Sequence, residues 1–198
     1  MVIDIDILLA WGGTYKKYAA EEIIFQESGI CSYYYQLVSG SIRWVNVDEE
    51  GKEILQVMIW PGDCFGEIPL FDGGVYAATS FANENVVVIR LTKPIFIKLL
   101  KQNPEIHFDI TKNFAERLRF KFMLLGVLSN HHPEQSIKHL FSYFKKNQKN
   151  ICSNCNKVVL TRQQIADMIG LRVETVIRAI RTMHNNGELL IDKGKVYC

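Results

Sequence analysis

Residues 61–80, PGDCFGEIPLFDGGVYAATS, place closely spaced glycines and acidic side chains between two apolar runs. Glycines at such spacing let backbone N–H groups approach a ligand, often an anionic one. This stretch contains no Lys or Arg to meet an anion. It therefore has the outline of an anion-binding loop without the cations that usually complete one.

A second group of side chains able to do chemistry lies on a predicted helix at 173–184. The side chains on or near its outer face are Arg172, Glu174, Thr175, Arg178 and Arg181. Arg can pair bidentately with guanine, Glu can accept from cytosine, and Thr can contact phosphate or a thymine methyl. From Lys157 onward, seven Lys and Arg stand against four Asp and Glu, whereas the whole chain has a net charge of only +2. The positive charge is thus concentrated here, which favours double-stranded DNA as a partner.

The cysteines offer a third kind of chemistry. Cys152 and Cys155 form a C-x-x-C pair, which can bind zinc or cycle between thiol and disulfide. A structural zinc needs two more ligands, and Cys198 and His184 are only distant candidates. We favour solvent-facing or packing thiols over metal or redox use, and we expect no metal site and no cofactor.

Two short helices must position the polar group near the C-terminus. Thr161 is a predicted N-cap for a helix at 162–169, and Gly170 suits the left-handed turn that ends it. After the second helix, ELLIDKGKVYC predicts a two-stranded wing with Lys193 at its tip. Two short helices joined by a glycine turn predict a helix-turn-helix, whose second helix enters the major groove. A pair of helices for protein interaction is the alternative.

The N-terminal half predicts short strands from about residue 21 to residue 90, rich in Ile, Val, Tyr and Trp and separated by Gly- and Asp-containing turns. The spacing is typical of an antiparallel barrel or sandwich. At Lys93-Pro94 and Asn103-Pro104 the pattern changes to helices, the second running to about residue 129. Because this long helix is apolar on more than one side, we favour a second subunit along a coiled-coil-like seam that includes Phe114 and Leu118. The alternative is a helix packed only on its own domain.

Composition is that of a globular protein, with 48% hydrophobic and 22% charged residues. No segment reaches the ~18 to 20 apolar residues that a membrane span needs, and the start lacks a secretory signal. We therefore expect a cytoplasmic protein with reduced cysteines and no membrane partner. The predicted domains are residues 1–103, 104–130 and 131–198.

The whole chain resembles the family of bacterial transcription regulators that includes the cyclic-AMP receptor protein and FNR. The resemblance rests on LTRQQIADMIGLRVETVIRAI, on GSIRWVN and GKEILQVMIWPGDCFGE, and on the long helix, in this order. It implies an α+β fold with a cyclic-nucleotide-binding-like antiparallel β-barrel (a double-stranded β-helix), a dimerisation helix and a winged helix-turn-helix. It also implies a homodimer, a small-molecule effector and RNA polymerase as a candidate partner.

By this resemblance, Glu174 and Arg178 contact base edges, while Thr175 and Arg162 position the DNA backbone. The family's commonest recognition helix has an Arg directly before the Glu. Here that position is Val173, and Arg172 lies one step earlier. We therefore expect a target sequence that differs at that base pair. The predicted DNA-binding residues are Arg162, Arg172, Glu174, Thr175, Arg178 and Lys193.

The resemblance also assigns the opening stretch to the effector pocket. Gly66 and Glu67 stand where relatives place a backbone donor and a carboxylate for ribose. Relatives then carry Arg-Ser for the cyclic phosphate, and this chain has Tyr76-Ala77; the base-contacting pair on the long helix is replaced by Lys121 and Phe122. Burying a phosphate without a cation or a hydroxyl donor costs several kcal/mol. The pocket is therefore either a remnant of the fold or a site for a different, more aromatic effector.

The sequence thus predicts a homodimeric, DNA-binding transcription regulator that is not an enzyme and does not respond to cyclic AMP. The alternative is a cupin-like small-molecule-binding protein or enzyme. Against it, residues 21–90 contain no His, so the barrel lacks the usual metal ligands of such an enzyme.

Overall fold

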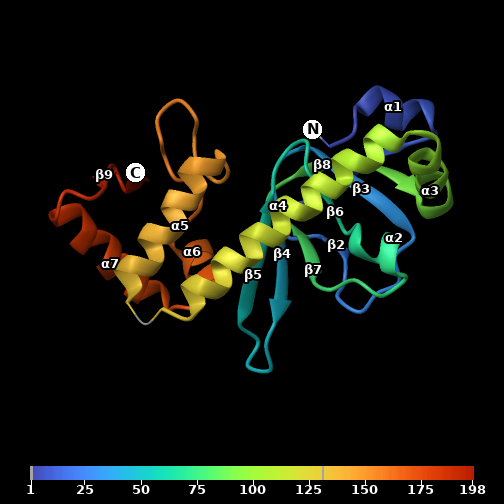
Figure 1. Ribbon diagram of the computed structural model, residues 1–198. Coiled ribbons are helices and arrows are strands. Elements are labelled where there is room, and N and C mark those ends of the chain that lie inside the picture. The colour runs from blue at the N-terminus through green and yellow to red at the C-terminus, as the bar shows by residue number, and fades with distance from the viewer. Residues whose placement is uncertain (1, 131) are drawn as a thin grey trace. The chain divides into compact units, whose positions relative to one another are not determined.

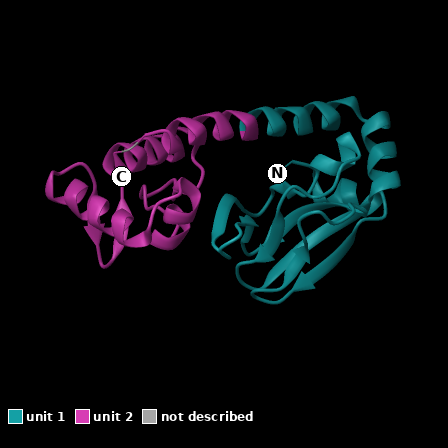
Figure 2. Cartoon of the chain, turned by 90° about the horizontal axis from the view of Figure 1, so that it is seen from below, with its two compact units in different colours: residues 1–116 teal, residues 117–198 magenta. Residues whose placement is uncertain are grey.

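The structure is a computed structural model that describes residues 2–130 and 132–198. The chain forms two compact units, residues 1–116 and 117–198 (Figure 2). The predicted division places boundaries at both ends of the long helix α4 (Pro104–Leu128), whereas the boundary between the compact units falls within this helix.

The first unit is mainly built from strands. In chain order it contains α1 (Ile5–Ala10), β1 (Thr14–Tyr18), β2 (Ile23–Phe25), β3 (Tyr33–Ser39), β4 (Ile42–Val47), β5 (Glu53–Ile59), β6 (Cys64–Phe65), α2 (Ile68–Asp72), β7 (Thr79–Ala82), β8 (Val86–Thr92), α3 (Lys93–Gln102) and the first part of α4 (Figure 1). The strands form two four-stranded antiparallel sheets, ordered β1-β8-β3-β6 and β2-β7-β4-β5. This confirms the predicted antiparallel β-domain.

Alternation along β3 sends successive aromatic side chains to opposite faces of the first sheet. Tyr35 faces inward, where its ring lies 5.3 Å from Phe65 and 5.8 Å from Phe25 of the other sheet. Tyr34 faces outward and stacks on Phe96 of α3, with ring centroids 4.5 Å apart. One sheet thus contributes both to the interior between the sheets and to a second apolar layer beneath the helices.

The outer layer also holds the start of the chain. The buried Gln36 side chain accepts from the Ile3 N–H at 3.0 Å and donates to the Ile3 carbonyl at 2.7 Å. Leu8 of α1 is fully buried in the same core. The sequence pattern did not predict α1. Asp4 caps the N-terminus of this helix, and its side chain accepts from the Asp6 N–H.

The second unit carries the predicted helix pair and wing. It contains α5 (Pro133–Asn147), α6 (Arg162–Ile169), α7 (Val173–Asn185), β9 (Leu190–Asp192) and β10 (Lys195–Tyr197), in addition to the last part of α4. Its buried side chains include Phe141 and Phe144 of α5, Ile165 of α6 and Ile180 of α7. These helices therefore share one core.

Among the described residues, no helix combines the length and apolar character that crossing a membrane requires.

The N-cap of α6 gives a first prediction. Thr161 Oγ1 accepts from the Gln164 N–H at 3.1 Å, and Gln164 Oε1 accepts from the Thr161 N–H at 2.9 Å, which completes a capping box. Thr161→Ala should lower the free energy of unfolding of the second unit by about 1 kcal/mol, measured by urea denaturation. The control is Thr182→Ala, which removes an exposed α7 hydroxyl that donates to the Arg178 carbonyl of the same helix. Equal effects of the two substitutions would contradict the capping role.

Candidate nucleic-acid interface and ligand pocket

The helix pair in the second unit has the geometry of a helix-turn-helix. Gly170 ends α6 in the left-handed region, with φ at 67°, and α7 begins three residues later. Ala166 is fully buried, and its carbonyl accepts from the backbone N–H groups of Gly170 and Leu171. The small side chain and the glycine turn together let α7 pack close to α6.

The two faces of α7 differ sharply in chemistry. Its buried face consists of Val176, Ala179, Ile180 and Met183. Glu174 and Arg178 are exposed on the other side, Thr175 is half-buried near the start of the helix, and Arg172 is exposed at its N-cap. The structure therefore brings the predicted base-contacting side chains together at one end of one exposed helix face. Arg181, exposed one turn further along, extends that face.

Arg162 joins the first helix of the pair to the wing. Its guanidinium donates from Nη2 to the Gly194 carbonyl at 3.3 Å, and burial lowers the pKa of Arg162. The wing tip is the two-residue turn Lys193-Gly194, in which φ is 44° and 75°. Positive φ at both positions is the geometry of a tight hairpin turn, and it leaves the Lys193 side chain exposed. Arg162 thus positions the wing that carries Lys193.

The predicted pocket begins with the turn between β6 and α2. Gly66 has φ at 68°, and Glu67 follows at the N-cap of α2 with only 1% of its surface exposed. Asp72 ends this short helix by accepting from the Gly74 N–H at 2.8 Å. These residues therefore have a structural role in shaping the turn and ending the short helix.

Aromatic side chains fill the space beside this turn. Tyr76 stacks on Phe25 with ring centroids 3.8 Å apart and an interplanar angle of 11°. A Cβ atom added to Gly66 would lie 2.7 Å from Phe25 and 3.1 Å from Tyr76. Both rings therefore lie directly against the backbone of Gly66, where the resemblance would put the ribose of a nucleotide.

The side chains of Tyr76 and Ala77 lie in different surroundings. The Tyr76 side chain is buried, and burial, reinforced by a hydrogen bond with Cys31, raises the pKa of its phenol far above the ordinary value. Ala77 is exposed, and its carbonyl accepts from Asn46 Nδ2 at 2.8 Å. Neither residue supplies a cation or a hydroxyl donor suited to a phosphate.

A cation that the sequence analysis missed lies on β8. Arg90 has its guanidinium 4.5 Å from the centre of the Tyr33 ring, and its Nε is buried with no hydrogen-bond partner among the residues that the structure describes. Burial raises the pKa of the neighbouring Tyr35 phenol, whereas the positive charge of Arg90 lowers it. Burial has the larger effect and raises the pKa of Tyr35 to about 12. In the sequence, a single Arg inside the otherwise apolar run VVVIRL could have indicated this half-buried cation.

Lys121 and Phe122, the remaining predicted pocket residues, belong to the part of α4 in the second unit. Phe122 is 65% exposed. Burial, assisted by repulsion from Arg117, lowers the pKa of Lys121 to about 8, so its ammonium remains largely charged at neutral pH.

The helix α4 is apolar on more than one side, as predicted. Ile110 is buried in the core of the first unit, and Phe120 and Leu124 are buried in the second. A further set of large apolar side chains is more than half exposed: Phe108, Leu118, Phe122, Leu125 and Leu128. We call these five residues the α4 stripe. Phe114, expected in the seam, instead packs edge-on against Phe71 with ring centroids 5.2 Å apart.

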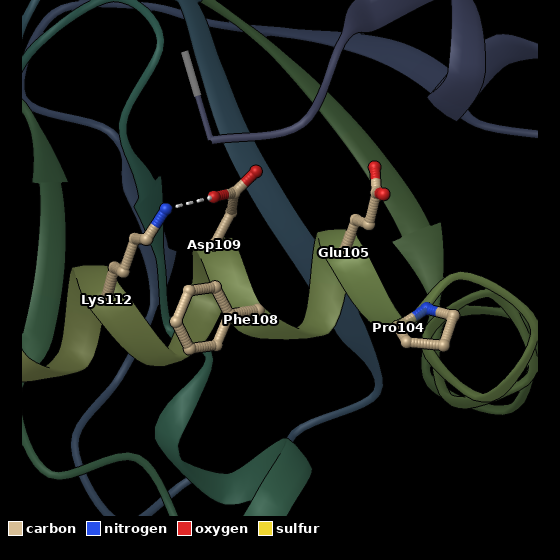
Figure 3. A pocket seen from close by; sticks show the side chains of 5 residues that line it. All are labelled: Pro104, Glu105, Phe108, Asp109 and Lys112. Atoms are coloured by element: carbon tan, nitrogen blue, oxygen red, sulfur yellow. Dashed lines mark hydrogen bonds and ion pairs between the residues drawn. The ribbon is translucent and has the colours of Figure 1, made fainter.

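The first turns of α4 border a shallow surface hollow of about 440 Å³, lined by Pro104, Glu105, Phe108, Asp109 and Lys112 (Figure 3). Lys112 Nζ lies 3.2 Å from Asp109 Oδ1 and 4.8 Å from the centre of the Phe108 ring. Because one helix supplies the whole lining, the hollow is better suited to packing against another helix than to enclosing a small ligand.

Comparison with known proteins agrees with this architecture. Residues 15–103 match the family of cyclic nucleotide-binding domains, and residues 139–197 match the Crp-like helix-turn-helix domain. Over 200 residues the chain is 26% identical to the cAMP-activated global transcriptional regulator CRP of Haemophilus influenzae, covering 96% of this chain and 89% of that relative.

Solved structures with the same fold include FixK2 from Bradyrhizobium japonicum and the c-di-GMP responsive global regulator CLP of Xanthomonas campestris. FixK2 has a TM-score of 0.79 and 21% identity, covering 93% of this chain and 91% of its own. CLP has a TM-score of 0.77 and 16% identity, covering 98% of this chain and 96% of its own. The likeness therefore extends over both units and α4.

Proposed function

This chain belongs to the Crp/Fnr family of transcription regulators, and we propose that it acts as a homodimer whose two α7 helices read two half-sites of double-stranded DNA. The observation that carries this proposal is the exposed face of α7, where Glu174 and Arg178 lie opposite a buried apolar face and the exposed N-cap residue Arg172 precedes them. These are the side-chain types that read base edges in the major groove.

The remaining predicted residues support DNA binding from the flanks. Lys193, at the exposed wing tip, is suited to a phosphate, and Arg162 supports that tip from α6. RNA polymerase stays a predicted partner. Since the proposed ligand is genomic DNA in a bacterium, we place the protein in the cytoplasm. The curated relative is a regulator rather than an enzyme, and we propose the same for this chain in place of the cupin-like alternative.

For the pocket, we propose that it does not hold cyclic AMP. The CRP relative is activated by cAMP according to its name, but here two stacked rings occupy the space at Gly66 and no Arg-Ser pair follows. Losing a bidentate charge-assisted pair forfeits several kcal/mol, which corresponds to roughly a thousandfold in affinity. An effector of this barrel would instead meet phenols and the Arg90 guanidinium.

The α4 stripe supports the dimer. Phe108, Leu118, Phe122 and Leu125 recur at intervals of ten, four and three residues, which keeps them on one seam of the helix. Exposed side chains of this size along a helix are typical of an interface with another helix. A second copy of the chain presents the same stripe and would complete a two-fold seam.

Arg178 tests the DNA interface. On a site selected from a random-sequence library, Arg178→Ala should cost about 1–3 kcal/mol and relax the preference at one base pair. Lys193→Ala should weaken binding to all sequences and reduce the slope of log affinity against log salt by about 1. Lys101→Ala, an exposed Lys on α3, is the control. An Arg178→Ala protein that keeps the parent's affinity and sequence preference would refute readout by α7.

Leu118 and Phe122 test the dimer. Leu118→Glu with Phe122→Glu places charges in the proposed seam, so sedimentation should show monomers, and DNA affinity should fall by roughly 10² because the half-sites are no longer engaged together. Gln102→Glu with Asn147→Glu adds the same charge at exposed positions away from the stripe and should stay dimeric. A parent protein that sediments as a monomer at micromolar concentration would rule out the seam.

Cyclic AMP tests the pocket. Calorimetry of ligand-stripped protein should show binding weaker than about millimolar. Tyr76→Arg with Ala77→Ser removes the ring and supplies the missing fork and hydroxyl, so it should create measurable nucleotide binding. The matched control, Tyr76→Leu with Ala77→Ser, opens the space without a cation and should not.

Micromolar binding by the parent protein would overturn this part of the proposal. If Lys121→Met or Arg90→Met then abolished cyclic AMP binding, the substituted residue would be the cation that binds the phosphate.

A further inference from the structure

The C-x-x-C pair lies in a tight turn of a small hairpin within the second unit. Ile151 and Val158 form an antiparallel bridge, the Cys152 N–H donates to the Lys157 carbonyl at 2.8 Å, and the Asn156 N–H donates to the Cys152 carbonyl at 2.8 Å. Asn156 adopts φ of 56°, which closes the turn. Backbone hydrogen bonds therefore hold Cys152 at the start of the turn that carries Cys155 three residues later.

The two thiols of this turn are inequivalent. Cys152 Sγ interacts with the Cys155 thiol and receives hydrogen bonds from the backbone N–H groups of Asn154 and Cys155, with the charge of Lys157 adding to them; together these lower the pKa of Cys152. Cys155 is exposed to solvent and Cys152 is partly so. An accessible thiol with a lowered pKa, next to a second exposed thiol in the same turn, is the arrangement that exchanges with disulfides.

In place of the solvent-facing or packing thiols expected from the sequence alone, we propose that Cys152 and Cys155 form a thiol–disulfide pair, in which Cys152 is the attacking residue and Cys155 is the resolving residue. The oxidant is a low-molecular-weight disulfide. The Cys152 thiolate attacks one of its sulfurs, the S–S bond of the oxidant breaks, and one small thiolate leaves. Cys155 then loses its proton to solvent and attacks the Cys152 sulfur, which releases the second small thiol. The two protein thiols are oxidised by two electrons, and the oxidant is reduced to two thiols.

The surroundings favour this chemistry over metal binding. Within residues 2–130 and 132–198, no three His, Cys, Asp or Glu side chains are grouped so as to hold a metal ion. The backbone of Cys198 lies close to the turn, because its N–H donates to the Asn156 carbonyl at 3.2 Å. The Cys198 thiol is half-buried against the same carbonyl, and burial raises the pKa of this thiol. A disulfide needs only the two thiols already present, whereas a structural zinc needs four ligands.

The hairpin is joined to the proposed wing. Lys157 pairs with Tyr197 of β10, and the Val158 N–H donates to the Val196 carbonyl at 2.9 Å. The cysteine hairpin therefore pairs with β10 near Tyr197, whereas Lys193 lies in the turn that precedes the other end of β10.

The test uses the full chain and oxidised glutathione as the probe. Proteins are incubated in glutathione buffers of defined ratio, quenched in acid, alkylated and mapped by peptide mass spectrometry. The parent should form an intramolecular Cys152–Cys155 disulfide. Cys155→Ser should accumulate glutathione on Cys152, because the resolving thiol is gone, whereas Cys152→Ser should lose the rapid reaction and accumulate little.

Cys198→Ser is the control, and it should behave like the parent. Equal rates of glutathionylation in Cys152→Ser and Cys155→Ser would overturn the assigned roles. A parent that never forms the intramolecular disulfide, or whose two thiols are protected by a stoichiometric metal until a chelator is added, would overturn the proposal itself.

Discussion

The close approach of two aromatic rings to Gly66 is the constraint around which the first unit is built. Phe25 comes from β2 of one sheet, Gly66 follows β6 of the other, and Tyr76 lies just before β7, so their contact ties the two sheets together. A side chain at Gly66 has no room, and its φ of 68° is unfavourable for other residues. Stacked aromatic pairs contribute about 0.5–1.5 kcal/mol beyond the area they bury.

This packing also decides what chemistry the barrel interior offers. Burial raises the pKa values of Tyr35 and Tyr76, so at neutral pH these phenols are uncharged hydrogen-bonding groups. The guanidinium of Arg90 contributes positive charge from β8 beside Tyr33. The first unit thus matches a nucleotide-binding domain in fold, while its interior includes a cluster of aromatic rings and phenols, with the half-buried Arg90 beside Tyr33.

Features coded by local sequence were predictable. Thr161 and Gly170 mark the ends of α6, Pro104 marks the start of α4, and the alternation of apolar residues marks the strands. Features that depend on distant partners were not. Phe114 reads as a seam residue by spacing, but its position depends on Phe71, more than forty residues away. The stacking of Tyr76 on Phe25 likewise depends on how the sheets meet, which periodicity does not reveal.

In the proposed dimer, the composition of the α4 stripe bears on which chains can pair. Phe and Leu side chains contribute much of the affinity of such an interface but little of its specificity. An apolar seam accepts other apolar side chains of similar size, whereas an unpaired or like charge at the interface is strongly unfavourable. Discrimination then depends on charged neighbours such as Asp109, Lys112 and Arg119. A cell that makes several regulators with such helices must separate them by these flanking charges, or mixed dimers would form and recognise hybrid operators made of two unlike half-sites.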